Sequence, residues 1–112
     1  MTPRVERPDM RDYGVPEGLD GLLPWSWALE RLVVARNYWF TTASPDGRPH
    51  SLPVWGVWLG EPDRFWCSCS PNARKLRNLR GNTHVVVAPD DSVEVVSVEG
   101  LARQVSAEES RK

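Results

Sequence analysis

The chain has 112 residues, of which 40% are hydrophobic and 26% are charged, and its formal net charge is -1. This length suits one domain with a single core, and the composition is typical of a soluble globular protein. A nearly neutral chain argues against a nucleic-acid module, and no apolar run approaches the roughly 20 residues of a membrane span. We therefore expect a cytoplasmic protein whose partners include no nucleic acid and no membrane.

Residues 1–22 are polar and rich in proline and glycine, which predicts an N-terminal arm beside a folded domain of residues 23–112. The first residues also lack the apolar stretch of a secretory signal. From Pro24, the sequence PWSWALERLVVARN places apolar residues at helical spacing, and Asn37 suits the end of the helix. We expect this helix to lie across the mouth or one face of a sheet.

Three segments rich in aromatic and β-branched residues follow, NYWFTTA, HSLPVWGVWLG and RFWCSCS, at residues 37–43, 50–60 and 64–70. The turn-forming sequence SPDG joins the first two segments, and GEPD joins the second to the third. The pattern predicts three strands in an antiparallel meander.

The second of these strands is apolar on both faces after Ser51, which indicates a barrel or a sheet whose outer face is covered by a partner chain. Pro53 lies within this strand, and proline cannot donate a hydrogen bond to a neighbouring strand. We therefore expect strand pairing to be interrupted near Pro53, which would leave backbone groups free.

Cys67 and Cys69 are the only cysteines and lie two residues apart, so their side chains would point to the same face of a strand. A disulfide at this spacing is strained, and a lone C-x-C lacks the second ligand pair of a structural zinc site. We expect both to be buried or half-buried apolar side chains, and we expect no metal site.

The segment SPNARKLRNLRGN, residues 70–82, holds four basic residues and no acidic residue. Ser70 and Pro71 suit the start of a helix and Gly81 suits its end, which predicts a helix from Pro71 to Arg80. Helical spacing divides its side chains into a sector that docks on the sheet and a polar sector on the other side. The docking sector holds Ala73, Leu76 and Leu79, and the polar sector holds Arg74, Lys75 and Asn78.

Cations in the N-terminal half of a helix oppose its macrodipole. This misfit is removed if an anion, for which phosphate is the obvious candidate, binds where the helix N-terminus, Arg74 and Lys75 meet. Taken alone, the segment is equally well explained as a solvated basic face. Its place beside an aromatic strand with free backbone groups favours a ligand with a phosphate tail and a flat ring, such as a flavin phosphate.

After this helix, THVVVAP and VEVVSVEGLARQV predict two further strands at residues 83–89 and 93–105, which makes five strands in all. The sequence SAEE, residues 106–109, is a capping-box start of another helix, and only three residues follow it. The chain is therefore expected to stop where a further element should begin.

The segments YWFTTASPDGRPHSLPVWGVW, ARKLRNL and VEVVSVEGLARQV resemble the pyridoxamine 5′-phosphate oxidase-like family of flavin-binding proteins. The sequence most resembles the actinobacterial branch, which includes proteins that use FMN or the deazaflavin coenzyme F(420). The resemblance spans roughly Leu23 to Ser106 and implies a mainly β fold, an FMN-binding split β-barrel with six strands and short α-helices. It also implies a homodimer with the cofactor between the subunits, and a last helix and strand that a C-terminally truncated chain would lack.

Carried over to this sequence, the resemblance implies a cofactor site with two parts. The backbone around His50, Ser51, Leu52, Pro53, Val54 and Trp55 would face the ring system, and Arg74, Lys75 and Asn78 would hold the phosphate, with a hydroxyl from Ser70. Ala73 stands where the family usually has a serine that adds a phosphate contact.

Family members transfer hydride or electrons, often without an indispensable side-chain acid or base, and no catalytic side chain is assigned here. The expected activity is that of a flavin- or deazaflavin-dependent oxidoreductase acting on a small-molecule substrate. A non-catalytic carrier of a cofactor or tetrapyrrole, using the same groove, is the alternative.

Overall fold

The computed structural model describes residues 3–6, 12 and 21–105. In chain order, the elements are α1 (Trp25–Val34), β1 (Asn37–Ala43), β2 (Pro49–Leu59), β3 (Arg64–Cys67), α2 (Arg74–Gly81), β4 (His84–Pro89) and β5 (Val98–Leu101). The strands form one antiparallel sheet in the order β3-β2-β1-β4-β5. The helix predicted at residues 106–109 and most of the predicted N-terminal arm lie outside the described residues.

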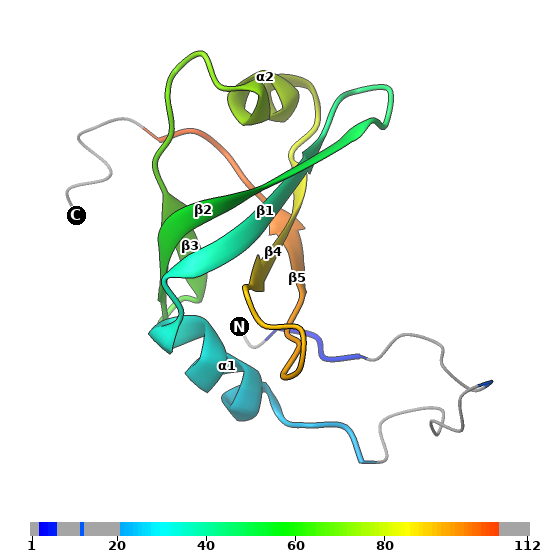
Figure 1. Cartoon of the computed structure of the whole chain (residues 1–112), viewed down its shortest axis with the longest axis vertical. Helices are drawn as coiled ribbons and strands as arrows, with labels where there is room; N and C mark the ends of the chain where they lie inside the picture. Colours follow the sequence, from blue (N-terminus) through cyan, green and yellow to red (C-terminus); the bar gives the residue numbers. More distant parts are fainter. Residues whose placement is uncertain (1–2, 7–11, 13–20, 106–112) are drawn as a thin grey trace.

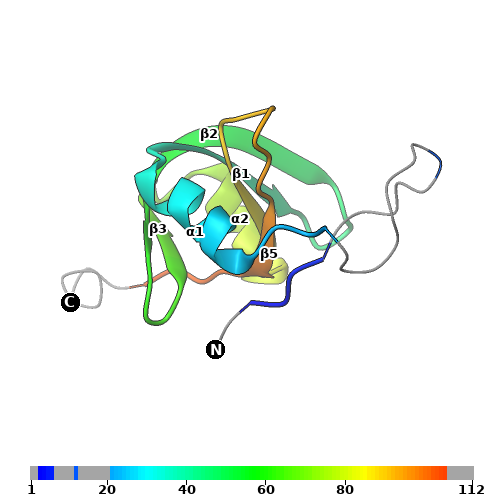
Figure 2. The same ribbon diagram turned by 90° about the horizontal axis from the view of Figure 1, so that it is seen from below.

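The sheet curls into a half-barrel, with α1 at one end and α2 at the other (Figures 1 and 2). The prediction of a mainly β barrel with short helices is confirmed. No helix within the described ranges is long and apolar enough to cross a membrane.

Helix α1 packs against β2 and β4 and buries Leu32 completely. Its C-terminal end is held by Tyr38, whose hydroxyl lies 2.6 Å from the carbonyl oxygen of Leu32 and 2.9 Å from that of Ala35. Helix ends leave carbonyl groups without intrahelical partners, and the single proton of this hydroxyl is within reach of both carbonyl oxygens. The predicted helix is confirmed, and it closes one end of the barrel.

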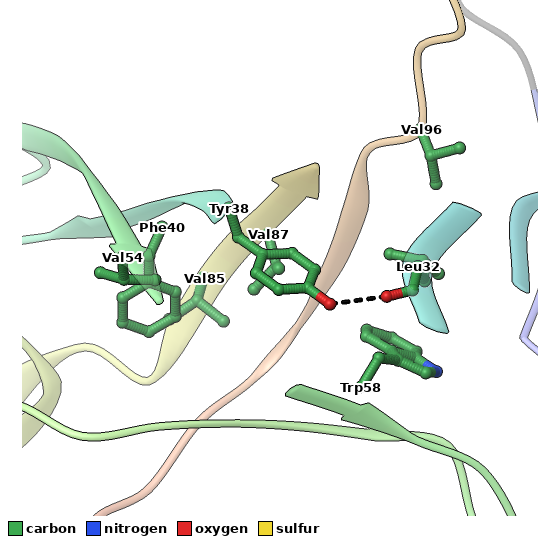
Figure 3. Close-up of a cluster of buried hydrophobic side chains, with 8 residues drawn as sticks. All are labelled: Leu32, Tyr38, Phe40, Val54, Trp58, Val85, Val87 and Val96. Atoms are coloured by element: carbon green, nitrogen blue, oxygen red, sulfur yellow. Dashed lines mark hydrogen bonds between the residues drawn. The ribbon is translucent and has the colours of Figure 1, made fainter. Parts of the chain in front are cut away.

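The core fills the concave side of the sheet (Figure 3). Alternation along β1 sends Tyr38, Phe40 and Thr42 inward, while Trp39 is 43% exposed on the outer face. The ring of Phe65 packs edge-on against Tyr38, with the ring centroids 4.7 Å apart. The buried cluster consists of Leu32, Tyr38, Phe40, Val54, Trp58, Val85, Val87 and Val96.

Strand β2 pairs with β1 without a break from Pro49 to Trp55, so the predicted interruption at Pro53 is wrong. The N–H of Gly56 donates to the carbonyl oxygen of Arg36 over 3.2 Å, on the β1 side of the strand. Backbone groups alternate in direction along a strand, so residues 51, 53 and 55 direct theirs to the opposite edge. The nitrogen of Pro53 therefore points away from β1, so its missing N–H removes no hydrogen bond between the two strands.

That opposite edge is largely uncovered, because β3 pairs only with Gly56–Leu59 of β2. Over residues 49–55, no strand of the described chain lies against it. We call this stretch the open edge of β2. Free backbone groups are present as predicted, but their cause is the shortness of β3 and not a break at Pro53.

The last predicted strand is also shorter than expected, since β5 spans only Val98–Leu101 instead of residues 93–105. The preceding connection is bound locally, because the carboxylate of Asp91 accepts the N–H groups of Val93 and Glu94 at 2.8 and 3.0 Å. Glu94 in turn accepts a 2.9 Å ion-paired hydrogen bond from Arg31 of α1. These contacts fold the segment over the end of the barrel instead of extending it along β4.

Candidate functional site

The basic helix begins later than the sequence predicts. Residues 70–73 form a turn, in which the N–H of Ala73 donates to the carbonyl oxygen of Ser70 at 3.0 Å. The hydroxyl of Ser70 accepts the N–H of Asn72 at 3.3 Å within this turn, and so does not cap the helix. Ala73 is the N-cap residue, without a side-chain hydrogen bond, and Gly81 is the last helical residue rather than the residue after the end.

The later start places Arg74 and Lys75 at the first two positions of α2. Their backbone N–H groups donate no hydrogen bond to any described residue, and the first turn holds no acidic side chain. The side chain of Arg74 is exposed and that of Lys75 is half-buried. This helix start therefore combines two free N–H donors, the positive end of the macrodipole and two cations, which is the chemistry of an anion site.

The other two cations of the segment are placed differently. Arg77 donates from Nη1 to the carbonyl oxygen of Asn72 at 2.9 Å, which ties its side chain to the turn. Arg80 lies in the last turn of α2, where a cation suits the negative end of the macrodipole.

Asn78 does not belong to an exposed polar sector, contrary to the prediction from helical spacing. Its side chain is 6% exposed, and its Nδ2 donates to Oγ1 of Thr42 on β1 at 2.9 Å. Leu76 is buried as predicted. The docking face of α2 thus includes a polar residue, because β1 presents a hydroxyl at the matching position.

The predicted ring-binding residues divide between the two faces of β2. His50 and Val54 face inward, half-buried and buried respectively, while Ser51 and Trp55 face outward. Leu52 lies on the inner face yet is 46% exposed, which shows that the concave side is not covered there. Pro53 is exposed on the outer face, where it pairs with Trp39 of β1.

The end of β3 lies between the two parts of the predicted site along the chain. Cys67 pairs with Gly56, just beyond the open edge of β2. Burial raises the pKa of the Cys67 thiol above its ordinary value, Cys69 adds to this rise, and the charge of Lys75 partly opposes it. Residues 68–73 connect the end of β3 to the start of α2.

Sequence reasoning missed Thr42 as a partner of α2. The signal was its inward position in the alternation of β1, two residues after the buried Phe40. Both cysteines are free and half-buried, as predicted.

A curled antiparallel half-barrel with a basic helix at one end defines the class of the protein as a split β-barrel. Residues 31–112 match the family model described as pyridoxamine 5′-phosphate oxidase, and the chain belongs to this family. A search of curated proteins finds no match to the chain.

Among solved structures, the chain is similar to HutZ, described as the heme storage protein from Vibrio cholerae. The TM-score is 0.58 at 18% sequence identity, and the match covers 77% of this chain and 68% of the HutZ chain. At this identity, the likeness shows that the fold is shared.

Proposed function

We propose that the protein binds a phosphate-bearing flavin, FMN or the deazaflavin coenzyme F(420), and transfers hydride or electrons between it and a small-molecule substrate. The observation that carries this proposal is the start of α2, where Arg74 and Lys75 follow an uncapped N-terminus in a chain of the pyridoxamine 5′-phosphate oxidase family. When bound, the cofactor would supply the redox chemistry, and the protein would bind and orient it.

The helix start supports a phosphate ligand because its own electrostatics are unbalanced. Arg74 and Lys75 stand at the positive end of the macrodipole, where cations are unfavourable. A phosphate dianion there would accept the two free N–H groups and pair with both side chains. Ser70, in the turn just before, would direct its hydroxyl proton to the same anion.

The open edge of β2 supports the second half of the proposal, which concerns the flat ring. A flavin ring carries donors and acceptors along its edge, and an uncovered strand edge offers the matching backbone groups. Residues 51, 53 and 55 present such groups. Trp55 is 83% exposed beside this edge, and it is the aromatic side chain we assign to the wall of the ring site.

The outer face of the sheet supports a homodimer with the cofactor at the subunit interface. Large apolar side chains are exposed there, and a monomer in water rarely leaves so many side by side. A second copy of the chain covering this face would also shield the ring site from water. The residues are Trp39, Trp55, Val57 and Leu59, which are 43%, 83%, 45% and 40% exposed.

The experiment is a titration of the purified full-length chain with FMN, followed by flavin fluorescence, and with coenzyme F(420), followed by its own fluorescence. We expect saturable binding of one of the two, weakened about ten-fold or more in Lys75→Ala, because hydrogen bonds to charged groups contribute about 1.5–3 kcal/mol. Arg80→Ala removes a cation from the same helix and is the matched control, with unchanged binding. The proposal fails if neither cofactor binds, or if Lys75→Ala and Arg80→Ala behave alike.

A second candidate is a non-catalytic carrier of a tetrapyrrole, which the shared fold with a heme storage protein favours. A heme carrier commonly supplies an axial ligand, for which the chain has His50, half-buried on β2, and His84, exposed at the start of β4. Titration with hemin decides between the two functions. A saturable Soret shift that disappears in His50→Ala or His84→Ala, without FMN or F(420) binding, would establish the carrier and exclude the oxidoreductase.

A further inference from the structure

Where α2 meets β1, two buried polar side chains are joined by a hydrogen bond. Thr42 is 1% exposed and Asn78 is 6% exposed. Their hydrogen bond, from Nδ2 of Asn78 to Oγ1 of Thr42, measures 2.9 Å.

An apolar pair would fill the same space without the cost of removing two polar groups from water. Apolar burial has no direction, whereas a buried hydrogen bond holds only when both groups keep their orientation. The pair therefore fixes how far α2 is rotated about its axis and where it lies along β1. Leu76, the other buried residue of the helix, buries apolar surface but does not fix the rotation of α2 in this way.

The place of Asn78 in the helix connects this constraint to the anion site. Residues three and four positions apart lie on the same side of a helix, and Asn78 follows Lys75 by three and Arg74 by four. Helical side chains lean toward the N-terminus, so the amide of Asn78 lies beneath the turn that carries both cations. A rotation of α2 by one residue, about 100°, would carry both cations and both free N–H groups away from their present direction.

The C-terminal end of α2 is attached independently. Nδ2 of Asn82 donates to the carbonyl oxygen of Ser44 at 3.4 Å, in the turn between β1 and β2. This contact holds the far end of the helix but does not set the direction of its first turn. Asn82 therefore provides a matched control for Asn78.

We propose that Asn78, through Thr42, is a positioning residue that aims the start of α2 at the phosphate of the cofactor and so selects phosphorylated over unphosphorylated flavin. The proposal rests on the function proposed above and deepens it. Asn78 acts through the hydrogen bond to β1 and not as a ligand of the phosphate, since its amide donates to Thr42 and its side chain is buried.

The experiment compares the affinities of the full-length chain for FMN and for riboflavin, which has the same ring and no phosphate. Asn78→Leu and Thr42→Val each remove one partner at nearly constant volume. We expect each to weaken FMN binding about ten-fold while leaving riboflavin binding unchanged, because a misdirected helix start loses charge-assisted contacts only. Thr42→Ser keeps the hydroxyl and should restore FMN affinity, and Asn82→Ala should leave the ratio of the two affinities unchanged.

The double variant Thr42→Val/Asn78→Leu should bind FMN no more weakly than the weaker single variant, because both changes break one bond. Equal loss of FMN and riboflavin binding in Asn78→Leu would show a purely structural role and overturn this inference while the proposed function stands. Equal affinity of the unaltered chain for FMN and riboflavin would also overturn it. If the unaltered chain binds no cofactor at all, the proposed function and this inference both fail.

Discussion

The replacement Tyr38→Phe tests how α1 is attached to the barrel. The Tyr38 side chain is completely buried, and its hydroxyl serves the carbonyl oxygens of Leu32 and Ala35 at the end of α1. A phenylalanine keeps the ring and its contact with Phe65, so the change removes the hydroxyl and little else.

The cost follows from the asymmetry of buried hydrogen bonds. Losing the net benefit of one bond costs about 1 kcal/mol, and leaving a buried carbonyl group without a donor adds about 1 kcal/mol or more. We therefore expect the free energy of unfolding to fall by about 2 kcal/mol. For a domain of this size, such a change lowers the melting temperature by about 10 °C.

Urea denaturation followed by tryptophan fluorescence measures this change. Thr41→Val is the control, because it removes a hydroxyl from the same strand whose bond to Ser51, at 2.8 Å, is exposed. We expect the control to change the free energy of unfolding by less than about 0.5 kcal/mol. A Tyr38→Phe effect as small as that of Thr41→Val would refute the attachment of α1 by this hydroxyl.

Three further predictions concern packing, pH and the outer face. Gly56→Ala should lower the free energy of unfolding by about 2–3 kcal/mol in the same urea assay. The reason is that the added Cβ would meet the Phe65 ring and lie 2.9 Å from the carbonyl oxygen of Trp66. An effect smaller than that of Thr41→Val would show that β3 shifts to make room for the Cβ. Burial raises the pKa of Tyr38 above its ordinary value of 10.0, so the tyrosine of the unfolded chain ionises at lower pH than that of the folded chain. The free energy of unfolding should therefore decline above about pH 10. Denaturation curves taken at increasing pH should show a smaller decline for Tyr38→Phe. Trp55→Lys should leave the free energy of unfolding within about 0.5 kcal/mol of its original value, since the side chain is 83% exposed. The same change should convert the proposed dimer to a monomer in sedimentation equilibrium. If the unaltered chain is already a monomer, the proposed interface is wrong.

The strands of the meander were predictable because their chemistry is local. The aromatic and β-branched run of β1 has the predicted bounds of Asn37–Ala43, and the turn after it follows from Gly47, whose φ of 89° suits glycine. The amphipathic pattern of α1 likewise gave its position, since one apolar stripe suffices to define a helix.

The predictions that proved wrong concern segments whose structure depends on tertiary contacts. Ser70 and Pro71 have the chemistry of a helix start, yet the turn of residues 70–73 uses the Ser70 hydroxyl first and delays α2 to Arg74. The break expected at Pro53 depended on which edge its nitrogen faces, and a sequence pattern does not reveal that. Residues 93–97 carry a strand pattern, but the Asp91 turn and the Arg31–Glu94 pair fold them otherwise.

The burial of Asn78 could not be predicted from the sequence. Helical spacing assigned Asn78 to the exposed face with Arg74 and Lys75, because the pattern places only apolar side chains against the sheet. It does not show that the sheet offers a hydroxyl as a partner for the amide. The bond to Thr42 reverses that assignment and gives Asn78 a different proposed role. The cofactor contacts of the remaining site residues stay predictions.

A crystal structure of the full-length chain with FMN would show whether the start of α2 binds the phosphate of the cofactor. We expect the FMN phosphate at the first turn of α2, with its oxygens within about 2.7–3.2 Å of the backbone nitrogens of Arg74 and Lys75. We also expect the ring against the open edge of β2. A phosphate bound elsewhere, with these two nitrogens unoccupied, would refute the proposed phosphate site.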